Sequence, residues 1–419
     1  IMTDNNENKV LNVPHLRFPK FSGEWEICKV SELLDFYSTN SLSWEQLEYG
    51  EKAMMNLHYG LIHVGLPTMV DLRRDKLPNV KEGNMPKNFE LCKEGDVAFA
   101  DASEDTNEVA KVIELFNLDN KDIVCGLHTI HGRDNKNKTI VGFKGYAFSS
   151  SAFHNQIRRI AQGTKIYSIS TKNFSECYVG IPSKAEQTKI ATLLRLIDER
   201  IATQNKIIEK LQSLIKGLND NIHKGIKGET VCFSDLGEAY SGLSGKGGDD
   251  FGYGEPFITY MNVYQNTYIS EKDYELVQIA PNEKQNSVQY GDALFTLSSE
   301  TPEEVGIGAV YLGNTQKLYL NSFCFGIHFF DERVLPQYLA HFISSSSFRR
   351  AIYPLAQGST RFNLQKNDFM KMKFLLPSLE KQGHIANTLD ALHCRLANEK
   401  SLTEQYILLK KYLLSLMFI

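Results

Sequence analysis

Basic side chains are concentrated in two stretches of this chain, and their chemistry suits phosphate binding. Residues 131–172 hold eight lysines and arginines and one acid, and residues 349–373 hold six and one. Cations that neutralise phosphates supply most of the affinity of a nucleic-acid-binding surface, and an overall charge of −4 does not exclude such local patches. We predict phosphate contacts from Arg133, Lys136, Lys138, Lys144, Arg158, Arg159, Lys165, Arg349, Arg350 and Arg361.

No catalytic motif accompanies these basic stretches. The sequence lacks an Asn/Asp-Pro-Pro-aromatic tetrapeptide, HExxH, GxSxG and a Walker A loop. The glycine- and lysine-rich segment 242–248 lacks the spacing of a phosphate loop, so it is either a flexible surface loop or a contact of Lys246 with a nucleic-acid backbone. We therefore predict no catalytic residue and no cofactor bound by this chain.

Cysteine and histidine spacing argues against a metal site. No pair of cysteines forms CxxC, which favours free thiols in a reducing compartment, most simply as small buried apolar residues. The pairs His58/His63 and His128/His131 have no acidic third ligand at suggestive spacing, so we predict no metal. The polar start of the chain has no signal-peptide core, and the leucine-rich end is too short to span a bilayer, which together predict a cytoplasmic location and no membrane contact. The seven cysteines are Cys28, Cys92, Cys125, Cys177, Cys232, Cys324 and Cys394.

The chain contains a long internal duplication, which must organise these residues. Residues 161–202 align with 356–397 without a gap, with 12 identities in 42 positions. The motif Ala-Gln-Gly starts both copies, and Pro-Ser followed by Gln recurs in each. A period near 195 residues is too long for a solenoid repeat and indicates two copies of a whole domain. Loops between the shared anchors diverge, which suggests two surfaces that recognise different things.

A long helix with a heptad seam ends each copy. The first helix is predicted over 183–227, with a Ser183/Glu186 capping box and one polar seam position at Gln204. From Glu186 to Ile222 it would be about 55 Å long. The second is predicted over 378–419. We favour packing of the two seams against each other, with docking of each on a partner's helix as the alternative. The first seam is Ile190, Leu194, Ile197, Ile201, Ile208, Leu211, Ile215, Leu218 and Ile222; the second is Ile385, Leu389, Leu392, Leu396, Leu402, Tyr406, Leu409, Leu413 and Leu416.

These elements predict an α+β chain with two pseudo-symmetric mixed α/β domains joined by two long antiparallel coiled-coil helices. Short apolar runs at 96–100, 139–143, 256–261 and 323–329 are typical of strands, and short helices are expected at 105–117 and 335–351. The predicted segments are a tail at 1–24, domains at 25–182 and 228–377, and helices at 183–227 and 378–419.

The sequence resembles the specificity subunits of Type I restriction–modification systems. The resemblance covers the whole chain and its duplication, with one departure: Lys381-Gln382 stands where Glu-Gln is expected, and Gly383 follows early in the helix. It depends on Val13-Pro14-His15-Leu16-Arg17-Phe18-Pro19 before Gly23-Glu24-Trp25, on Ala-Gln-Gly-(Thr/Ser) at 161–164 and 356–359, and on Ile181-Pro182-Ser183 before Glu186-Gln187-Thr188-Lys189-Ile190-Ala191.

The resemblance implies two target-recognition domains, each reading one half of a split, asymmetric site in double-stranded DNA. The helices would set the spacer and dock two modification subunits, which carry S-adenosylmethionine, and restriction subunits that use ATP and Mg²⁺ would join them. Base contacts would lie in 65–75 and 130–146 for the first half-site and in 240–268 and 296–302 for the second. The candidates for base contact are Thr68, Arg73, Asn262 and Ser298.

Two other classes of function stay open at this point. One is a stand-alone DNA-modifying enzyme, which the missing methyltransferase tetrapeptide disfavours without excluding a metal nuclease. The other is a coiled-coil adaptor that binds proteins only. Methyl transfer by the chain alone would favour the enzyme, and a salt-dependent shift of a labelled duplex would exclude the adaptor.

Overall fold

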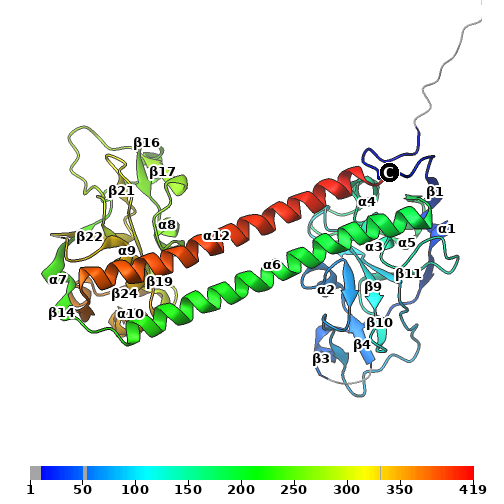
Figure 1. The fold of residues 1–419 in the computed structure, drawn as a ribbon, viewed down its shortest axis with the longest axis horizontal. Coiled ribbons are helices and arrows are strands. Elements are labelled where there is room, and N and C mark those ends of the chain that lie inside the picture. The colour runs from blue at the N-terminus through cyan, green and yellow to red at the C-terminus, as the bar shows by residue number, and fades with distance from the viewer. Residues whose placement is uncertain (1–10, 51–53, 331) are drawn as a thin grey trace, which may run out of the picture. The chain divides into compact units, whose positions relative to one another are not determined.

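The computed structural model describes residues 11–50, 54–330 and 332–419, which form two compact units (Figure 1). Unit 1 consists of Ile1–Asn205 and Ser401–Ile419, and unit 2 of Lys206–Lys400. Each unit contains a mixed domain and part of both long helices, so the predicted fold class is confirmed. The first ten residues of the predicted tail lie outside the described residues.

Unit 1 is built on four small sheets. The strands of its five-stranded sheet run in the order β2-β11-β7-β9-β5, and those of its four-stranded sheet in the order β10-β4-β6-β3. Their bounds are β2 Asp35–Tyr37, β11 Thr129–Arg133, β7 Val97–Ala100, β9 Val112–Asn117, β5 Met69–Asp71, β10 Asp122–Cys125, β4 Met54–Leu57, β6 Asn79–Val80 and β3 Leu47–Glu48. The two-stranded sheets pair β1 Glu26–Lys29 with β13 Tyr178–Ile181, and β12 Tyr167–Ser168 with β8 Ala102–Ser103.

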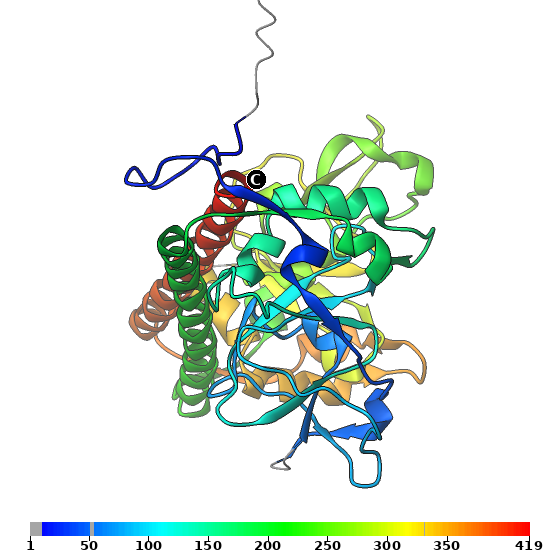
Figure 2. The same ribbon diagram turned by 90° about the vertical axis from the view of Figure 1, so that its right-hand side faces the viewer.

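Helices cover the apolar core of unit 1, which the phenylalanines of α3, α4 and α5 fill together with Phe99. The segment before β1 lies beside the end of the last helix, where Leu16 N donates to Leu416 O at 2.9 Å and Trp25 packs edge-on against Phe418 (Figure 2). The helices are α1 Val30–Leu33, α2 Tyr59–His63, α3 Lys144–Phe148, α4 Ser151–Ile160, α5 Thr171–Ser175 and the 3₁₀ turn η1 Trp44–Gln46.

Unit 2 repeats this plan with different loops. Its four-stranded sheet runs β15-β22-β18-β20, and its three-stranded sheets run β17-β16-β21 and β19-β24-β23. The strands are β14 Glu229–Cys232 paired with β25 Lys373–Leu376, β15 Gly237–Ser241, β22 Cys324–Phe329, β18 Ala293–Thr296, β20 Gly308–Val310, β17 Tyr274–Val277, β16 Phe251–Ile258, β21 Tyr319–Leu320, β19 Ser298–Ser299, β24 Phe362–Leu364 and β23 Ala356–Gln357. The helices are α7 Phe233–Leu236, α8 Tyr260–Gln265, α9 Pro336–Ile343, α10 Ser346–Ile352 and α11 Lys366–Met370, with 3₁₀ turns η2 Gly248–Asp250, η3 Glu271–Asp273, η4 Pro302–Glu304 and η5 Tyr353–Leu355.

Some local predictions were wrong because tertiary contacts override local pattern. Residues 105–117 form a turn and then strand β9, whose first four residues are buried in the sheet, so the predicted helix is absent. Residues 139–143 form no strand and lead into α3. The runs 96–100 and 323–329 are strands as predicted, and 335–351 holds α9 and α10.

The two long helices, α6 Lys184–Lys224 and α12 Leu379–Leu416, pack antiparallel within each unit. In unit 1, Lys410 Nζ lies 2.6 Å from Asp198 Oδ1, and Arg200 Nε donates to the Tyr406 hydroxyl at 3.3 Å. In unit 2, Ile215 of α6 and His393 of α12 line one hollow. The two helices therefore contact each other within each unit, as the favoured alternative predicts, while the pairing of one seam with the other stays a prediction. No helix in the described part of the chain offers the long apolar run needed to cross a membrane.

The start of each long helix is clamped by the glutamine of the repeated motif. Gln187 is fully buried; its amide donates to the carbonyls of Lys138 and Pro182 and accepts from Ile140 N. Gln382 makes the same three bonds in unit 2, to Arg333 O, Pro377 O and Leu335 N. The recurring glutamine thus fastens each helix to its own domain.

Replacing either glutamine with alanine is expected to lower the free energy of unfolding by about 2–4 kcal/mol. The reason is that three backbone groups lose their hydrogen-bond partner, one in a buried bond and two in partly buried bonds. The readout is urea unfolding of Gln187→Ala and Gln382→Ala. Thr188→Ala is the control, since Thr188 is exposed and bonds only to Lys184 O of its own helix. A glutamine variant as stable as this control would contradict the assignment.

Candidate nucleic-acid interface

The Ala-Gln-Gly motif forms the same tight hairpin in both units. In unit 1, Gln162 bridges to Ser168, and β12 then pairs with β8. In unit 2, Gln357 pairs with Asn363, and β24 then pairs with β19. Each hairpin therefore lies beside a short strand that ends at a Ser-Glu pair, which is Ser103-Glu104 in unit 1 and Ser299-Glu300 in unit 2.

Glycine is required in both hairpins. Gly163 has φ +142° and Gly358 φ +145°, a region that L side chains rarely adopt. A Cβ added at these positions would lie 1.9 Å from Ile166 O and 2.1 Å from Arg361 O. The glycine of the motif thus allows the backbone conformation that this exposed turn requires.

In unit 1, exposed cations surround this turn. Arg158 and Arg159 lie in the last turn of α4, directly before the motif, and Lys165 lies within the hairpin. All three are exposed. Arg158 is oriented by hydrogen bonds to the side-chain oxygens of Asn107 and Asn155. We name Arg158, Arg159 and Lys165 the unit 1 turn surface.

In unit 2, the corresponding turn borders a hollow of about 300 Å³. Arg361, which ends the turn, lines it together with Ser298, and both were predicted to bind DNA. The rings of Tyr260 and Tyr264 stack at 6.0 Å, and the carboxylates of Glu300 and Glu304 also face the hollow. An arginine, hydroxyls and carboxylates together offer the donors and acceptors that base edges require. We name this the unit 2 turn hollow.

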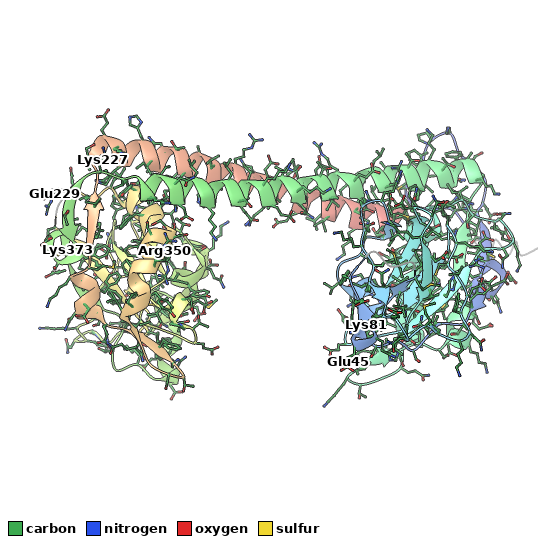
Figure 3. The ribbon with its side chains drawn as sticks, turned by 90° about the horizontal axis from the view of Figure 1, so that it is seen from below. Glu45, Lys81, Lys227, Glu229, Arg350 and Lys373 are labelled. Atoms are coloured by element: carbon green, nitrogen blue, oxygen red, sulfur yellow. The ribbon has the colours of Figure 1, made fainter. Side chains whose placement is uncertain are left out.

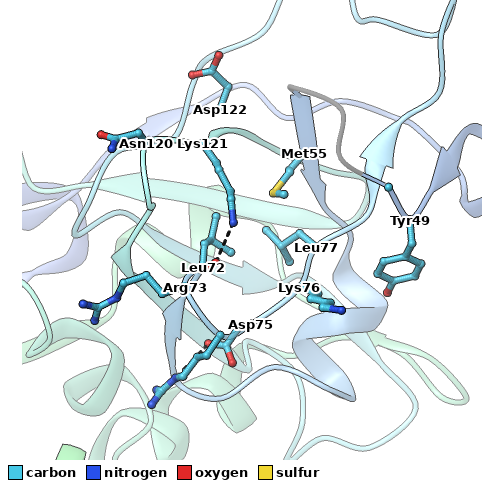
Figure 4. A pocket seen from close by; sticks show the side chains of 12 residues that line it. Tyr49, Met55, Leu72, Arg73, Asp75, Lys76, Leu77, Asn120, Lys121 and Asp122 are labelled. Atoms are coloured by element: carbon cyan, nitrogen blue, oxygen red, sulfur yellow. Dashed lines mark hydrogen bonds and ion pairs between the residues drawn. The ribbon is translucent and has the colours of Figure 1, made fainter.

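A second hollow, of about 830 Å³, lies in unit 1 around the loop after β5 (Figure 4). Arg73, predicted for base contact, is exposed at its wall but is held by Asp71, whose carboxylate accepts from the guanidinium. This hydrogen bond lowers the pKa of Asp71. Lys76 and Lys121 line the same hollow together with Asp75 and Asp122, so its wall carries charges of both signs.

Two predicted phosphate ligands are buried, which corrects their assignment. Arg133 is bound by Asp96, by Glu90 and by the carbonyl of Leu91, and its side chain is 7% exposed. Lys144 is 4% exposed and lies 3.1 Å from the buried Glu114. Both neutralise internal carboxylates, so neither is available to DNA.

Three further predicted residues serve the fold. Arg349 is mostly buried and donates to the carbonyls of residues 303, 305 and 306, which fixes the loop after β19. Asn262 is 2% exposed and bonds to the backbone of Ser270 on both sides. Lys246 is tied to Glu283 at 2.6 Å, which lowers the pKa of that carboxyl to about 2.

The other predicted residues do not gather on one face. Lys136 donates to Glu32 O, Lys138 pairs with Glu26, and Thr68 accepts from Lys410 of α12. Arg350, labelled in Figure 3, is exposed on α10. The basic stretches therefore place only part of their charge around the turns.

Most predicted seam residues are not available for partner docking. Ile190, Leu194 and Ile197 join the core of unit 1, and Ile385 and Leu389 join that of unit 2, because each helix packs on its own domain. Of the remaining predicted docking residues, Leu396 is buried, and Ile201, Ile208, Leu211 and Leu392 are half-buried. Leu409 of the predicted seam is 43% exposed.

Most of the exposed apolar side chains of α12 lie outside the predicted seam. Leu408 and Tyr412, one turn apart, are 64% and 59% exposed, and Ile407 is 50% exposed. With Leu409 they form what we name the α12 strip. Sequence reasoning missed this surface, because only packing shows which face of a leucine-rich helix is covered.

The prediction for the cysteines holds for five of seven. Cys232 is half-buried and Cys394 is exposed, while the others are buried. Two of the buried cysteines, Cys92 and Cys125, lie together with His131. Their separation along the chain gives no metal-binding spacing, so no sequence signal could have found this group.

Comparisons with known proteins agree with this arrangement. The family model described as the type I restriction modification DNA specificity domain matches residues 75–213 and 228–405, well over half of the chain. The specificity subunit of the EcoKI type I restriction enzyme of Escherichia coli K12 is 25% identical over 279 residues, which cover 60% of this chain and 58% of that protein. The chain thus matches less than two thirds of the length of this curated relative.

Solved structures share the fold. The S subunit of a type I restriction–modification system from M. genitalium superposes with a TM-score of 0.53 over 97% of this chain and 99% of its own, at 13% identity. A chain from a study of complex assembly and conformational transition of the type I R–M system gives 0.59 over 93% and 96%, at 14% identity. The duplicated domains, the repeated turn and the family match over both copies show that the chain belongs to the type I restriction–modification DNA specificity family.

Proposed function

We propose that this chain is the DNA-reading subunit of a type I restriction–modification complex and is not itself catalytic. Each unit reads one half of a bipartite, asymmetric duplex site, unit 1 through its turn surface and unit 2 through its turn hollow. The duplication carries this proposal: two copies present the same hairpin, but surround it with unlike side chains. A shared scaffold with unlike contact residues is what recognition of two different half-sites requires.

The uninterrupted α6 supports a spacer role for the helices. It spans 41 residues, about 60 Å at 1.5 Å per residue, and it contributes to both units. Major-groove half-sites on one face of DNA recur about every 34 Å, so a rod of this length suits two reading domains of finite width.

Partner subunits account for the exposed apolar surface. The α12 strip places four large apolar side chains in contact with solvent, more than scattered single residues explain. We assign this strip to docking of one of two modification subunits. In this proposal those subunits supply S-adenosylmethionine and methyl transfer, restriction subunits supply ATP- and Mg²⁺-dependent cleavage, and the complex acts in the cytoplasm.

Genome-wide mapping of methylated adenine in cells that carry the chain and its modification subunits tests the function. We expect methylation at one bipartite sequence, and loss of that pattern when the gene for this chain is deleted. Purified chain alone should transfer no methyl group to DNA. Methyl transfer without partners would support the stand-alone enzyme instead.

A binding experiment separates DNA reading from protein-only adaptor function. A labelled duplex with the mapped site should bind with an affinity that falls steeply with salt. Arg158→Ala with Arg159→Ala should reduce the slope of log K against log salt by about two, one for each phosphate contact. Lys87→Ala with Lys93→Ala, which removes equal charge from two exposed residues outside the predicted DNA contacts, is the control. An unchanged slope in the arginine variant would exclude this turn surface from the interface.

A further inference from the structure

A buried group of potential metal ligands lies in unit 1. The ligand atoms of Cys92, Cys125 and His131 all lie within 4.8 Å of one another, and the three side chains are 5% exposed or less. The two sulfurs are 3.6 Å apart. Two sulfurs bound at about 2.3 Å to one tetrahedral ion would be about 3.8 Å apart, so the pair already has the separation of two ligands of one ion.

One ring nitrogen of His131 lacks a hydrogen-bond partner among the described residues. The imidazole Nε2 is paired with Asp96 Oδ2 at 2.7 Å, but the buried Nδ1 has no hydrogen-bond partner among the described residues. An unpaired buried nitrogen costs free energy that a bound cation would recover. The arrangement of carboxylate, imidazole and open nitrogen is that of a metal-binding histidine held by its second nitrogen.

The duplication supplies an internal comparison. Cys92 N donates to Ile123 O, as Val288 N donates to Leu318 O in unit 2. In the sheet of unit 1, Cys125 is paired with Leu57, the residue before the N-cap of α2. In unit 2, Leu320 is paired with Ile258, the residue before the N-cap of α8. These hydrogen bonds and pairings match Cys92 with Val288 and Cys125 with Leu320.

His131 has a matching position as well. It lies opposite Tyr37 in the sheet, at the place where unit 2 has Gly326 opposite Tyr240. All three potential ligands of unit 1 are therefore absent from unit 2, while the aspartate persists as Asp96 and Asp292. Three ligand-type side chains occur together in one copy only.

We propose that Cys92, Cys125 and His131 bind one thiophilic divalent cation, of which Zn²⁺ is the type, in the first domain. Two thiolates balance the charge of the ion, and Asp96 is already balanced by Arg133, so the filled site is neutral inside the core. A solvent ligand completes the tetrahedron.

The ion has a structural role that is independent of the proposed function. It joins the turn before β7, the end of β10 and the middle of β11, three segments that sequence separates. Cross-linking them ties the four-stranded sheet, which contains β10, to the five-stranded sheet, which contains β11. At the equivalent positions of unit 2, Val288 and Leu320 pack in an apolar cluster instead.

Reduced full-length chain, stripped of metal and then supplied with Zn²⁺, should retain about one zinc per chain after gel filtration, measured by elemental analysis. Zinc should raise the thermal midpoint of unit 1 by ~5 °C. Cys92→Val with Cys125→Leu, which installs the unit 2 residues, should retain less than ~0.1 zinc. Cys177→Ala, which removes another buried thiol of unit 1, should retain the full amount.

A second measurement needs no variant. In urea at a concentration at which the metal-free chain reacts at these two buried thiols, zinc should protect Cys92 and Cys125 of the wild-type chain from alkylation, read by mass spectrometry, while exposed Cys394 still reacts. Wild-type chain that holds no zinc after reduction, equal zinc in the Val/Leu variant, or alkylation unaffected by zinc would each overturn the site. A Cys92–Cys125 disulfide whose reduction yields no zinc binding would overturn it equally.

Discussion

Replacing Arg361 with alanine is expected to weaken binding of the cognate duplex by about 5- to 150-fold, the range for loss of one bidentate base contact worth about 1–3 kcal/mol. Arg361 ends the unit 2 hairpin, is exposed, and lines the turn hollow. Because the tight turn at Gly358 fixes the backbone of Arg361, the arginine side chain extends from a fixed point toward the duplex. The loss should be confined to the half-site that unit 2 reads, measured by binding to duplexes with either half substituted.

The matched control is Arg133, an arginine that is buried where Arg361 is exposed. Arg133→Ala should lower the free energy of unfolding by about 3–5 kcal/mol, because it leaves Asp96 charged and buried without its partner. Burial by itself raises the pKa of Asp96, and hydrogen bonds from His131 and Arg133 bring it below its ordinary value. Arg361→Ala should leave stability unchanged. Equal loss of binding for both half-site substitutions, or destabilisation by Arg361→Ala, would contradict a base contact.

The two arginines also show what sequence reasoning reaches and where it stops. The duplication, the long helices and the repeated Ala-Gln-Gly motif are encoded in residue identity and spacing, so the sequence predicts them. That the motif folds as a hairpin is shown only by the structure. Charge counting, in contrast, treats Arg133 and Arg361 alike. Whether an arginine faces solvent or a buried aspartate depends on which strands pair, and that information lies in residues more than thirty positions away.

The proposed metal ligands Cys92, Cys125 and His131 likewise depend on contacts between residues that are distant in the sequence. Thirty-three residues separate the two cysteines, and only the pairing of β10 beside the turn before β7 brings them together. The packing of the helix seams could be predicted only in part. Heptad spacing predicted that α6 and α12 pack, but Ile190 and Ile385 pack into the domains as well, which a pattern on one helix cannot show.

Lengthening both long helices by four residues is expected to lengthen the spacer of the DNA target and leave both half-sequences unchanged. Four residues add about 6 Å and about one helical turn, so the seam stays on nearly the same face. At about 3.4 Å per base pair, this corresponds to one or two extra base pairs. The insertions are placed after Asn205 in α6 and after Lys400 in α12, because these positions lie where the antiparallel helices pass from one unit to the other.

Methylation mapping of the lengthened variant reads the spacer directly. Substituting the four residues after Asn205 without insertion controls for local sequence, and a four-residue insertion in the loop between β20 and β21 controls for chain length. Both controls should keep the original spacer. An unchanged spacer in the lengthened variant would mean that DNA distortion or partner subunits, rather than helix length, set the distance between half-sites. A changed half-sequence would mean that the helices also orient the reading turns, since a turn that rotates against the groove meets different base edges.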